Sequence, residues 1–314
     1  MTSPYQIVQL ASLGQALDEE LARRYSVLPL WQERDFLPRF AEAPQSQILI
    51  TSALLGLKRP WLEALPAVKA VCSWGVGYEN FDMQAARELG VVVSNTPDVL
   101  DNCVADMAWA LMFGVARRTS QGDRFVKTGQ WTGPGRFPMG TRVSGKKLGV
   151  VGLGRIGLAI AKRGAGFDME VRYHNRRERP EVPYAYEASL VELAQWADFL
   201  VLACPGGPET RHIANREVLR ALGPQGILVN IARGSVVDDE ALITALRNGE
   251  LGGAGLDVFT DEPRVPAALL DMDNVSLMPH VSSNTRETRR DLGQCVMDNI
   301  LSYMETGRLV TPLS

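Results

Sequence analysis

The segment Gly152–Gly157 (GLGRIG) has the glycine spacing of a turn that binds the pyrophosphate of a dinucleotide. An apolar run before it predicts a strand, and an alanine-rich run after it predicts a helix. Gly152 would allow the tight turn, Gly154 would let backbone amides approach the pyrophosphate, and Gly157 would let helix and strand pack closely. This context favours a dinucleotide site over a turn that binds nothing. The cofactor-binding residues expected here are Gly152, Leu153, Gly154, Arg155 and Ile156.

The next predicted strand, Glu170–His174, ends at Asn175, Arg176 and Arg177. A site for NAD usually places Asp or Glu at this position, where it accepts hydrogen bonds from the ribose hydroxyls. Here arginines follow instead, and a guanidinium pairs with a 2′-phosphate that a carboxylate would repel. We therefore expect NADPH as the preferred cofactor, with NADH as the alternative. The other interpretation of these arginines is a solvated surface run.

Polar side chains also follow three later predicted strands. They are Arg233, after Gly226–Ile231; Asp257 and Glu262, after Gly253–Leu256; and His280, after Val275–Met278. Open α/β sheets bind their ligands at the carboxyl ends of their strands. A hydride transfer to a carbonyl needs a group that polarises the carbonyl, a proton donor and a holder for any substrate carboxylate. These side chains could meet those needs.

The elements that must position these residues form two sets of strands that alternate with helical patterns, which is typical of parallel α/β folds. The first set is Gln6–Leu10, Ile48–Thr51, Val68–Ser73 and Val91–Ser94. The second set is Leu148–Gly152, Glu170–His174, Phe199–Ala203, Gly226–Ile231, Gly253–Leu256 and Val275–Met278. We expect an α/β protein with two Rossmann-like, doubly wound parallel sheets and an active-site cleft between the two domains.

The segments between and after the strand sets suggest how the domains are joined. Asp98–Arg118 has helical periodicity with Asp98 as its cap, and Thr119–Lys147 is predicted to be an extended excursion. A last helix, about Thr285–Thr306, should return to the first domain. The predicted substrate domain is therefore residues 1–97 plus 282–314, and the cofactor domain is residues 98–281.

The sequence resembles the D-isomer-specific 2-hydroxyacid dehydrogenases, most closely their hydroxypyruvate/glyoxylate reductase branch. The resemblance runs from about Val68 to the end through VGYENFD, SNTPDVL, GLGRIG, ACPGGPET, LVNIARGSVVDDEAL, GGAGLDVFTDEP and MPHVSSNT. It implies an NAD(P)-dependent reductase of small 2-keto acids. In that family Arg233 would hold the substrate carboxylate and polarise the keto oxygen, His280 would be the acid/base, and Glu262 would be its partner.

The resemblance assigns further contacts. Asp257, Ile231 and Ala232 would lie near the nicotinamide, Pro205 near the adenosine, and Ser282 and Ser283 beside the cofactor. The amides of Val76 and Gly77 would bind the substrate carboxylate, Trp74 would wall the pocket unless it is a core aromatic, and Asn102 is a weaker pocket candidate. The excursion around Trp131 and Phe137–Met139 would be the arm of a homodimer, or else an ordinary loop.

Composition narrows the function classes. The formal net charge is −3 over 314 residues, so neither nucleic acid nor an anionic membrane is an expected partner. The N-terminus lacks the pattern of a secretory signal, and the four cysteines have no metal-ligand spacing, which together favour a cytoplasmic protein with free thiols and no metal. Two alternatives remain: an NAD-dependent D-2-hydroxyacid dehydrogenase for another or larger 2-keto acid, and a dinucleotide-sensing binding protein.

Overall fold

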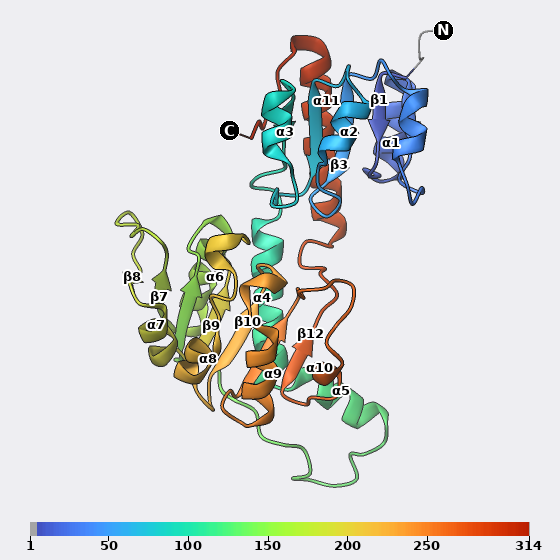
Figure 1. Ribbon diagram of the computed structural model, residues 1–314. Helices are drawn as coiled ribbons and strands as arrows, with labels where there is room; N and C mark the ends of the chain where they lie inside the picture. The colour runs from blue at the N-terminus through green and yellow to red at the C-terminus, as the bar shows by residue number, and fades with distance from the viewer. Residues whose placement is uncertain (1–4, 314) are drawn as a thin grey trace. The chain divides into compact units, whose positions relative to one another are not determined.

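The computed structural model describes residues 5–313 and divides the chain into two compact units (Figure 1). Unit 1 comprises Met1–Leu100 and Asn284–Ser314, and unit 2 comprises Asp101–Ser283. Among the helices of residues 5–313, none combines the length and the apolar character that crossing a bilayer requires.

Unit 1 is built on a five-stranded parallel sheet with the order β2-β1-β3-β4-β5, a doubly wound order. Its elements are β1 (Ile7–Gln9), α1 (Gln15–Arg24), β2 (Val27–Pro29), the 3₁₀ helix η1 (Leu37–Glu42), β3 (Ile48–Ser52), α2 (Arg59–Ala64), β4 (Ala70–Trp74), α3 (Met83–Glu88), β5 (Val92–Ser94) and α11 (Arg286–Thr306). Alternate strand residues pack into different clusters. Ile48 and Ile50 belong to the cluster that includes α1 and α11, whereas Leu49 belongs to the cluster that includes α2 and α3.

Unit 2 contains a seven-stranded parallel sheet with the order β12-β11-β10-β9-β6-β7-β8. Its strands are β6 (Lys147–Val151), β7 (Glu170–His174), β8 (Ala185–Tyr186), β9 (Phe199–Leu202), β10 (Ile227–Asn230), β11 (Gly253–Leu256) and β12 (Val275–Leu277). Its helices are α4 (Asp101–Ala116), α5 (Thr119–Lys127), α6 (Arg155–Gly164), α7 (Leu190–Trp196), α8 (Arg216–Leu222), α9 (Asp239–Arg247) and α10 (Ala267–Leu270), with 3₁₀ turns η2 (Ala165–Phe167), η3 (Pro208–Thr210) and η4 (Gly234–Val236). The strand order reverses between β6 and β9, and doubly wound sheets bind ligands beside such a switch point.

Helix α4 packs directly on β11 of the unit 2 sheet. A Cβ atom added at Gly255 would lie 2.9 Å from the Cβ of Leu111, and one added at Gly253 would lie 2.5 Å from Val115. The Trp109 Nε1 donates to the carbonyl of Ile160 (3.2 Å), and its ring stacks on Phe167 with centroids 4.7 Å apart. The glycines of β11 thus allow α4 to approach this strand, which leads into Asp257, while Trp109 joins α4 to α6 and η2.

The α/β class and the two parallel sheets are confirmed, and several predicted details are corrected. The structure adds the short strands β2 and β8. Thr119–Lys147 is not wholly extended, because its first nine residues form α5. Helix α4 begins at Asp101, three residues after Asp98, which has a φ of 65° in the left-handed region. Thr285 caps α11 through a bond from the Thr288 N–H, and α11 belongs to unit 1.

Candidate active site

The glycine-rich turn joins β6 to α6 with the backbone that the sequence predicts. Gly152 has a φ of 92°, and a Cβ there would lie 2.5 Å from the backbone nitrogen of Cys204. A Cβ at Gly157 would lie 2.1 Å from the Gly152 carbonyl oxygen. By contrast, Gly154 caps α6 and faces open space, so the helix N–H groups there remain accessible to an anion. The turn therefore has the close packing and the open cradle that a dinucleotide requires.

The segment after β7 is tied to this turn. The Leu153 N–H donates to the Asn175 Oδ1 (2.7 Å), and the Arg179 Nη1 donates to the Leu153 carbonyl (2.5 Å). Arg176 forms an ion pair with Glu209, which lies in η3 after β9, and Arg177 is exposed. Asn175 thus supports the turn itself. Arg179, which the sequence analysis did not single out, shares that role.

Arg233 follows β10 on a loop whose backbone is held by Asn230. The Asn230 side chain is buried; its Nδ2 donates to the Arg233 carbonyl and its Oδ1 accepts from the Ala232 N–H, both at 3.0 Å. The Arg233 stem packs on the β9 loop, because a Cβ at Gly206 would lie 2.8 Å from the Arg233 Cγ. Asn230 and Gly206 are site residues that sequence reasoning missed.

His280 and Glu262 form a direct pair. The His280 Nδ1 lies 2.6 Å from the Glu262 Oε2, and the other carboxylate oxygen accepts from the Phe259 N–H (3.0 Å). The side chains are 32% and 28% exposed, so the pair is half-buried. With Nδ1 held by a carboxylate, Nε2 is the ring nitrogen left to exchange a proton with a substrate.

Asp257 connects the strand ends around this pair. It is fully buried; its Oδ1 accepts from the Val281 N–H (2.8 Å), and its Oδ2 accepts from the N–H (3.0 Å) and hydroxyl of Ser282. Its backbone carbonyl accepts from the His280 N–H (2.8 Å), and its N–H donates to the Asn230 carbonyl (3.0 Å). The carboxylate therefore fixes the turn that carries His280.

The remaining cofactor candidates lie at the same edge of the unit 2 sheet. Ile231 and Ala232 are buried at the end of β10, Ser283 is half-buried, and the carbonyl of Pro205, after β9, accepts from the Thr210 hydroxyl (2.7 Å). Arg155 pairs with Asp101 at 3.4 Å, and Ile156 is half-buried at the start of α6. Within residues 5–313, no three His, Cys, Asp or Glu side chains gather in a way that could hold a metal ion.

The substrate-loop candidates belong to unit 1. The Asn95 Nδ2 donates to the Val76 carbonyl (2.8 Å), and the Gly75 N–H donates to the Thr96 hydroxyl (3.1 Å), so the two residues that follow β5 support the loop that contains Gly77. Trp74 packs partly against the cluster that includes α11, and the Arg289 guanidinium lies 5.8 Å from its ring centroid. Trp74 thus has core contacts on one side and a cation over its ring.

Other candidates have local roles. Both the carbonyl and the side chain of Asn102 accept from Arg163 at 3.3 Å. In the predicted arm, Trp131 is 68% exposed and Met139 is 94% exposed, while Phe137 contacts Phe125 of α5 with centroids 5.4 Å apart.

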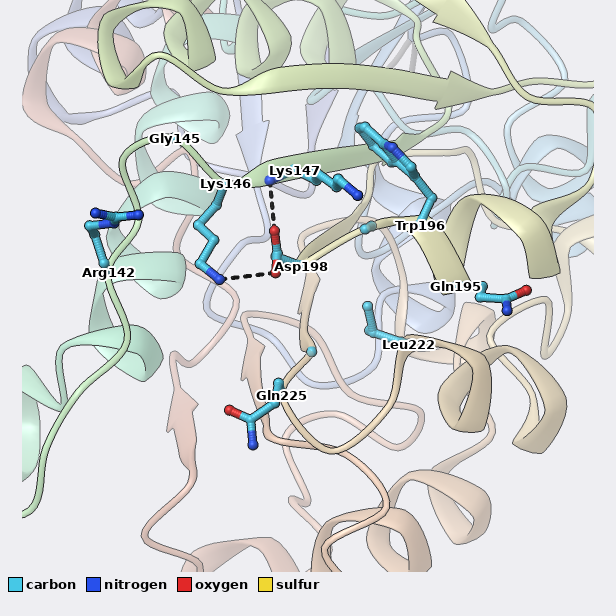
Figure 2. A pocket seen from close by; sticks show the side chains of 11 residues that line it. Arg142, Gly145, Lys146, Lys147, Gln195, Trp196, Asp198, Leu222 and Gln225 are labelled. Carbon is cyan, nitrogen blue, oxygen red and sulfur yellow. Dashed lines mark hydrogen bonds and ion pairs between the residues drawn. The ribbon is translucent and has the colours of Figure 1, made fainter.

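A cavity of about 490 Å³ lies at the opposite edge of the unit 2 sheet, where β6, β9 and β10 begin (Figure 2). Asp198 lies at its centre and accepts from the Lys146 Nζ (3.2 Å) and the Lys147 N–H (2.9 Å). Because the glycine-rich turn, Arg233 and His280 all follow the carboxyl ends of their strands, this cavity is separate from the candidate active site.

Comparison with known proteins agrees with this geometry. Residues 109–282 match the model of the D-isomer specific 2-hydroxyacid dehydrogenase NAD binding domain. The chain belongs to the D-isomer specific 2-hydroxyacid dehydrogenase family. It is therefore an oxidoreductase of the NAD(P)-dependent 2-hydroxyacid dehydrogenases, and the alternative of a purely sensing protein is set aside.

Several relatives of this dehydrogenase match nearly all of its length. It is 43% identical over 310 residues to hydroxyphenylpyruvate reductase of Plectranthus scutellarioides, with 98% of each chain covered. It is 40% identical over 311 residues to glyoxylate/hydroxypyruvate reductase A of Arabidopsis thaliana, again with 98% of each covered. The NADPH-dependent glyoxylate/hydroxypyruvate reductase of Sinorhizobium meliloti, solved in complex with NADP and malonate, superposes with a TM-score of 0.92 at 38% identity, covering 99% of this chain and 97% of that one.

Proposed function

We propose that this protein reduces small 2-keto acids such as glyoxylate and hydroxypyruvate to 2-hydroxy acids, with NADPH preferred over NADH. The observation that carries the proposal is the His280–Glu262 pair, which follows the strand ends at the same sheet edge as Arg233 and the glycine-rich turn. The similarity to glyoxylate/hydroxypyruvate reductases supports the substrate class.

In the proposed mechanism each residue of the candidate active site has a separate role. The glycine-rich turn would hold the dinucleotide, which would supply the hydride when bound. Arg233 binds the substrate carboxylate and polarises the keto oxygen through its planar fork of donors. His280 gives a proton from Nε2 to the oxygen that becomes the alkoxide, and Glu262 holds the opposite ring nitrogen. The amides of Val76 and Gly77 would be further donors to the substrate carboxylate.

The remaining contacts are also part of the proposal. The cofactor would be lined by Asn175, Arg176, Arg177, Pro205, Ile231, Ala232, Asp257, Ser282 and Ser283. The Asp257 carboxylate already accepts three hydrogen bonds from residues 281 and 282. In the proposed complex the same carboxylate would both contact the nicotinamide amide and support the turn that carries His280.

The proton-donor assignment is tested by His280→Ala. We expect the rate of NADPH oxidation with glyoxylate to fall by about 10²–10⁴-fold, the usual contribution of a positioned acid, with cofactor affinity nearly unchanged. His212→Ala is the matched control, because the same residue type is removed after a different strand. Near-normal turnover of His280→Ala at neutral pH would refute the role of His280.

Cofactor preference is tested by steady-state kinetics with NADPH and NADH on the wild type and Arg176→Ala. The exposed arginines after β7 support a contact with the 2′-phosphate. The substitution should therefore raise the KM for NADPH and leave the KM for NADH nearly unchanged. An NADH preference that the substitution does not alter would contradict the proposal.

A larger, aryl-substituted 2-keto acid is the second candidate substrate. The 43% identity to hydroxyphenylpyruvate reductase favours it. A panel of glyoxylate, hydroxypyruvate and phenylpyruvate with both cofactors, ranked by kcat/KM, distinguishes the two candidates.

We further propose a cytoplasmic homodimer joined through the arm around Trp131. The exposed Trp131 and Met139 support such a contact, and the four free thiols support a reducing compartment. Sedimentation velocity at micromolar concentration should show a dimer for the wild type and dissociation for Trp131→Ala. A wild-type monomer would count against the arm, and recovery of the native protein with an extracytoplasmic fraction would count against the compartment.

A further inference from the structure

The ion pair between Arg176 and Glu209 joins two loops on either side of the glycine-rich turn. Arg176 lies two residues beyond β7, and Glu209 lies in η3, beyond β9. In the sheet order, β6 lies between β7 and β9. The pair therefore spans from one neighbour of β6 to the other, at the edge where β6 continues into Gly152.

Both loops are anchored to the turn that they flank. The β7 loop is bonded to Leu153 through Asn175 and Arg179, as described above. The β9 loop approaches so closely that a Cβ at Gly152 would meet the backbone of Cys204 at 2.5 Å. Because these anchors fix both backbones, the Arg176–Glu209 contact depends on two side chains that can change rotamer without moving the loops.

The chemistry of the pair is that of an exchangeable contact. The two side chains are 78% and 70% exposed, and ion pairs this exposed contribute little net free energy. A guanidinium donates hydrogen bonds to a carboxylate or to a phosphate through the same planar fork of N–H groups. A phosphate group near Arg176 would therefore compete with Glu209 for the same donors.

We propose that Glu209 acts as a counter-ion that occupies Arg176 until a 2′-phosphate displaces it, and that Glu209 thereby limits the preference for NADP(H) over NAD(H). The proposal deepens the proposed function and rests on its assignment of Arg176 to the 2′-phosphate. Glu209 is a specificity-determining residue here, since NAD(H) has no group that must break the pair.

Isothermal titration calorimetry of NADP⁺ and NAD⁺ tests this without any turnover. The proteins compared are the wild type, Glu209→Gln, Arg176→Gln and the double variant. Glu170→Gln is the matched control, because Glu170 also pairs with an arginine, Arg172 (3.2 Å), but lies at the beginning of β7, away from the turn. Low ionic strength keeps the exposed charges unscreened.

We expect Glu209→Gln to lower the Kd for NADP⁺ about twofold to fivefold, the range set by loss of one exposed ion pair, and to leave the Kd for NAD⁺ nearly unchanged. In the Arg176→Gln background the same substitution should leave the Kd for NADP⁺ unchanged, because that protein no longer has the ion pair that Glu209 forms in the wild type. Glu170→Gln should bind both dinucleotides like the wild type.

Three results would overturn the proposal: an unchanged or weaker affinity of Glu209→Gln for NADP⁺, equal tightening for NAD⁺ and NADP⁺, or tightening that persists without Arg176. A different result marks failure of the underlying assignment. If Arg176→Gln binds NADP⁺ as tightly as the wild type, Arg176 does not contact the 2′-phosphate, and both the cofactor preference and the counter-ion role are rejected.

Discussion

Replacement of Asp257 by asparagine should damage both stability and turnover. The carboxylate is fully buried and accepts from two backbone N–H groups and one hydroxyl. An amide keeps one acceptor oxygen. If that oxygen takes the place of Oδ2 and serves Ser282, the amide NH₂ then faces the Val281 N–H, so that bond is lost and two donors oppose each other.

The magnitude follows from the loss of one hydrogen bond to a charged group and the weakening of two more. Each such bond contributes about 1.5–3 kcal/mol, so we expect Asp257→Asn to reduce the free energy of unfolding by about 2–4 kcal/mol. For a domain of this size that corresponds to a fall of about 4–16 °C in the unfolding midpoint. Since His280 donates its N–H to the Asp257 carbonyl and begins the affected turn, kcat should fall about tenfold to hundredfold as well.

Thermal unfolding followed by circular dichroism, together with the NADPH oxidation assay, measures both effects. Asp123→Asn is the control, because Asp123 lies on α5 with a 59% exposed side chain and forms an ion pair with Lys127 (2.9 Å) at the surface. A midpoint and a kcat that both match the wild type would refute the argument that Asp257 holds the His280 turn.

Three other substitutions or measurements test separate parts of the structure. Gly152→Ala should prevent dinucleotide binding in equilibrium titrations, because a Cβ would collide with the backbone of Cys204 at a φ of 92°; wild-type affinity would disprove the required close approach. Glu262→Gln should lower kcat about tenfold to hundredfold with unchanged Kd for NADPH, because an amide cannot stabilise the protonated ring of His280 as a carboxylate does; an unchanged kcat would remove Glu262 from the mechanism. Burial raises the pKa of the Cys72 thiol to about 12 and that of Cys204 to about 11, from an ordinary 9.0, so neither should react with Ellman's reagent at about pH 8 until denaturant is added. Since these thiols ionise more easily when unfolded, their contribution to stability is complete below about pH 9 and is lost as the pH rises toward 11–12; rapid labelling of either native thiol would contradict their burial.

The sequence predicted the parts of this protein that depend on local patterns. The strand, turn and helix around Gly152 are contiguous, and each glycine has a distinct steric reason. β2 was missed because it has only three residues and ends in Pro29. Helix α5 was missed because its nine residues include only two large apolar side chains, Phe125 and Val126, and none of the nine is buried.

The hydrogen bonds and ion pairs that hold the candidate-site residues in place could not be derived from the sequence, because they join residues that are far apart along the chain. Asp257 bonds to residues 24 and 25 positions further along the chain, and Arg176 pairs with Glu209 at a separation of 33. In the sequence, Asn230 is a polar residue at the end of a strand, and nothing in the pattern indicates that its side chain bonds the backbone of Ala232 and Arg233. Family resemblance supplied roles for Arg233, Glu262 and His280, but only three-dimensional neighbours explain how they are oriented.

The insertion of unit 2 within unit 1 has a consequence for synthesis on the ribosome. Residues 101–283 form a compact unit that can fold as soon as it emerges, whereas the unit 1 sheet lacks α11 until the end of the chain is made. Until then Ile7, Ile50 and Cys72 have no Val296 or Ile300 to cover them. Until α11 is made, the nascent protein thus carries an apolar sheet face that α1 covers only in part, a condition that favours aggregation or chaperone binding.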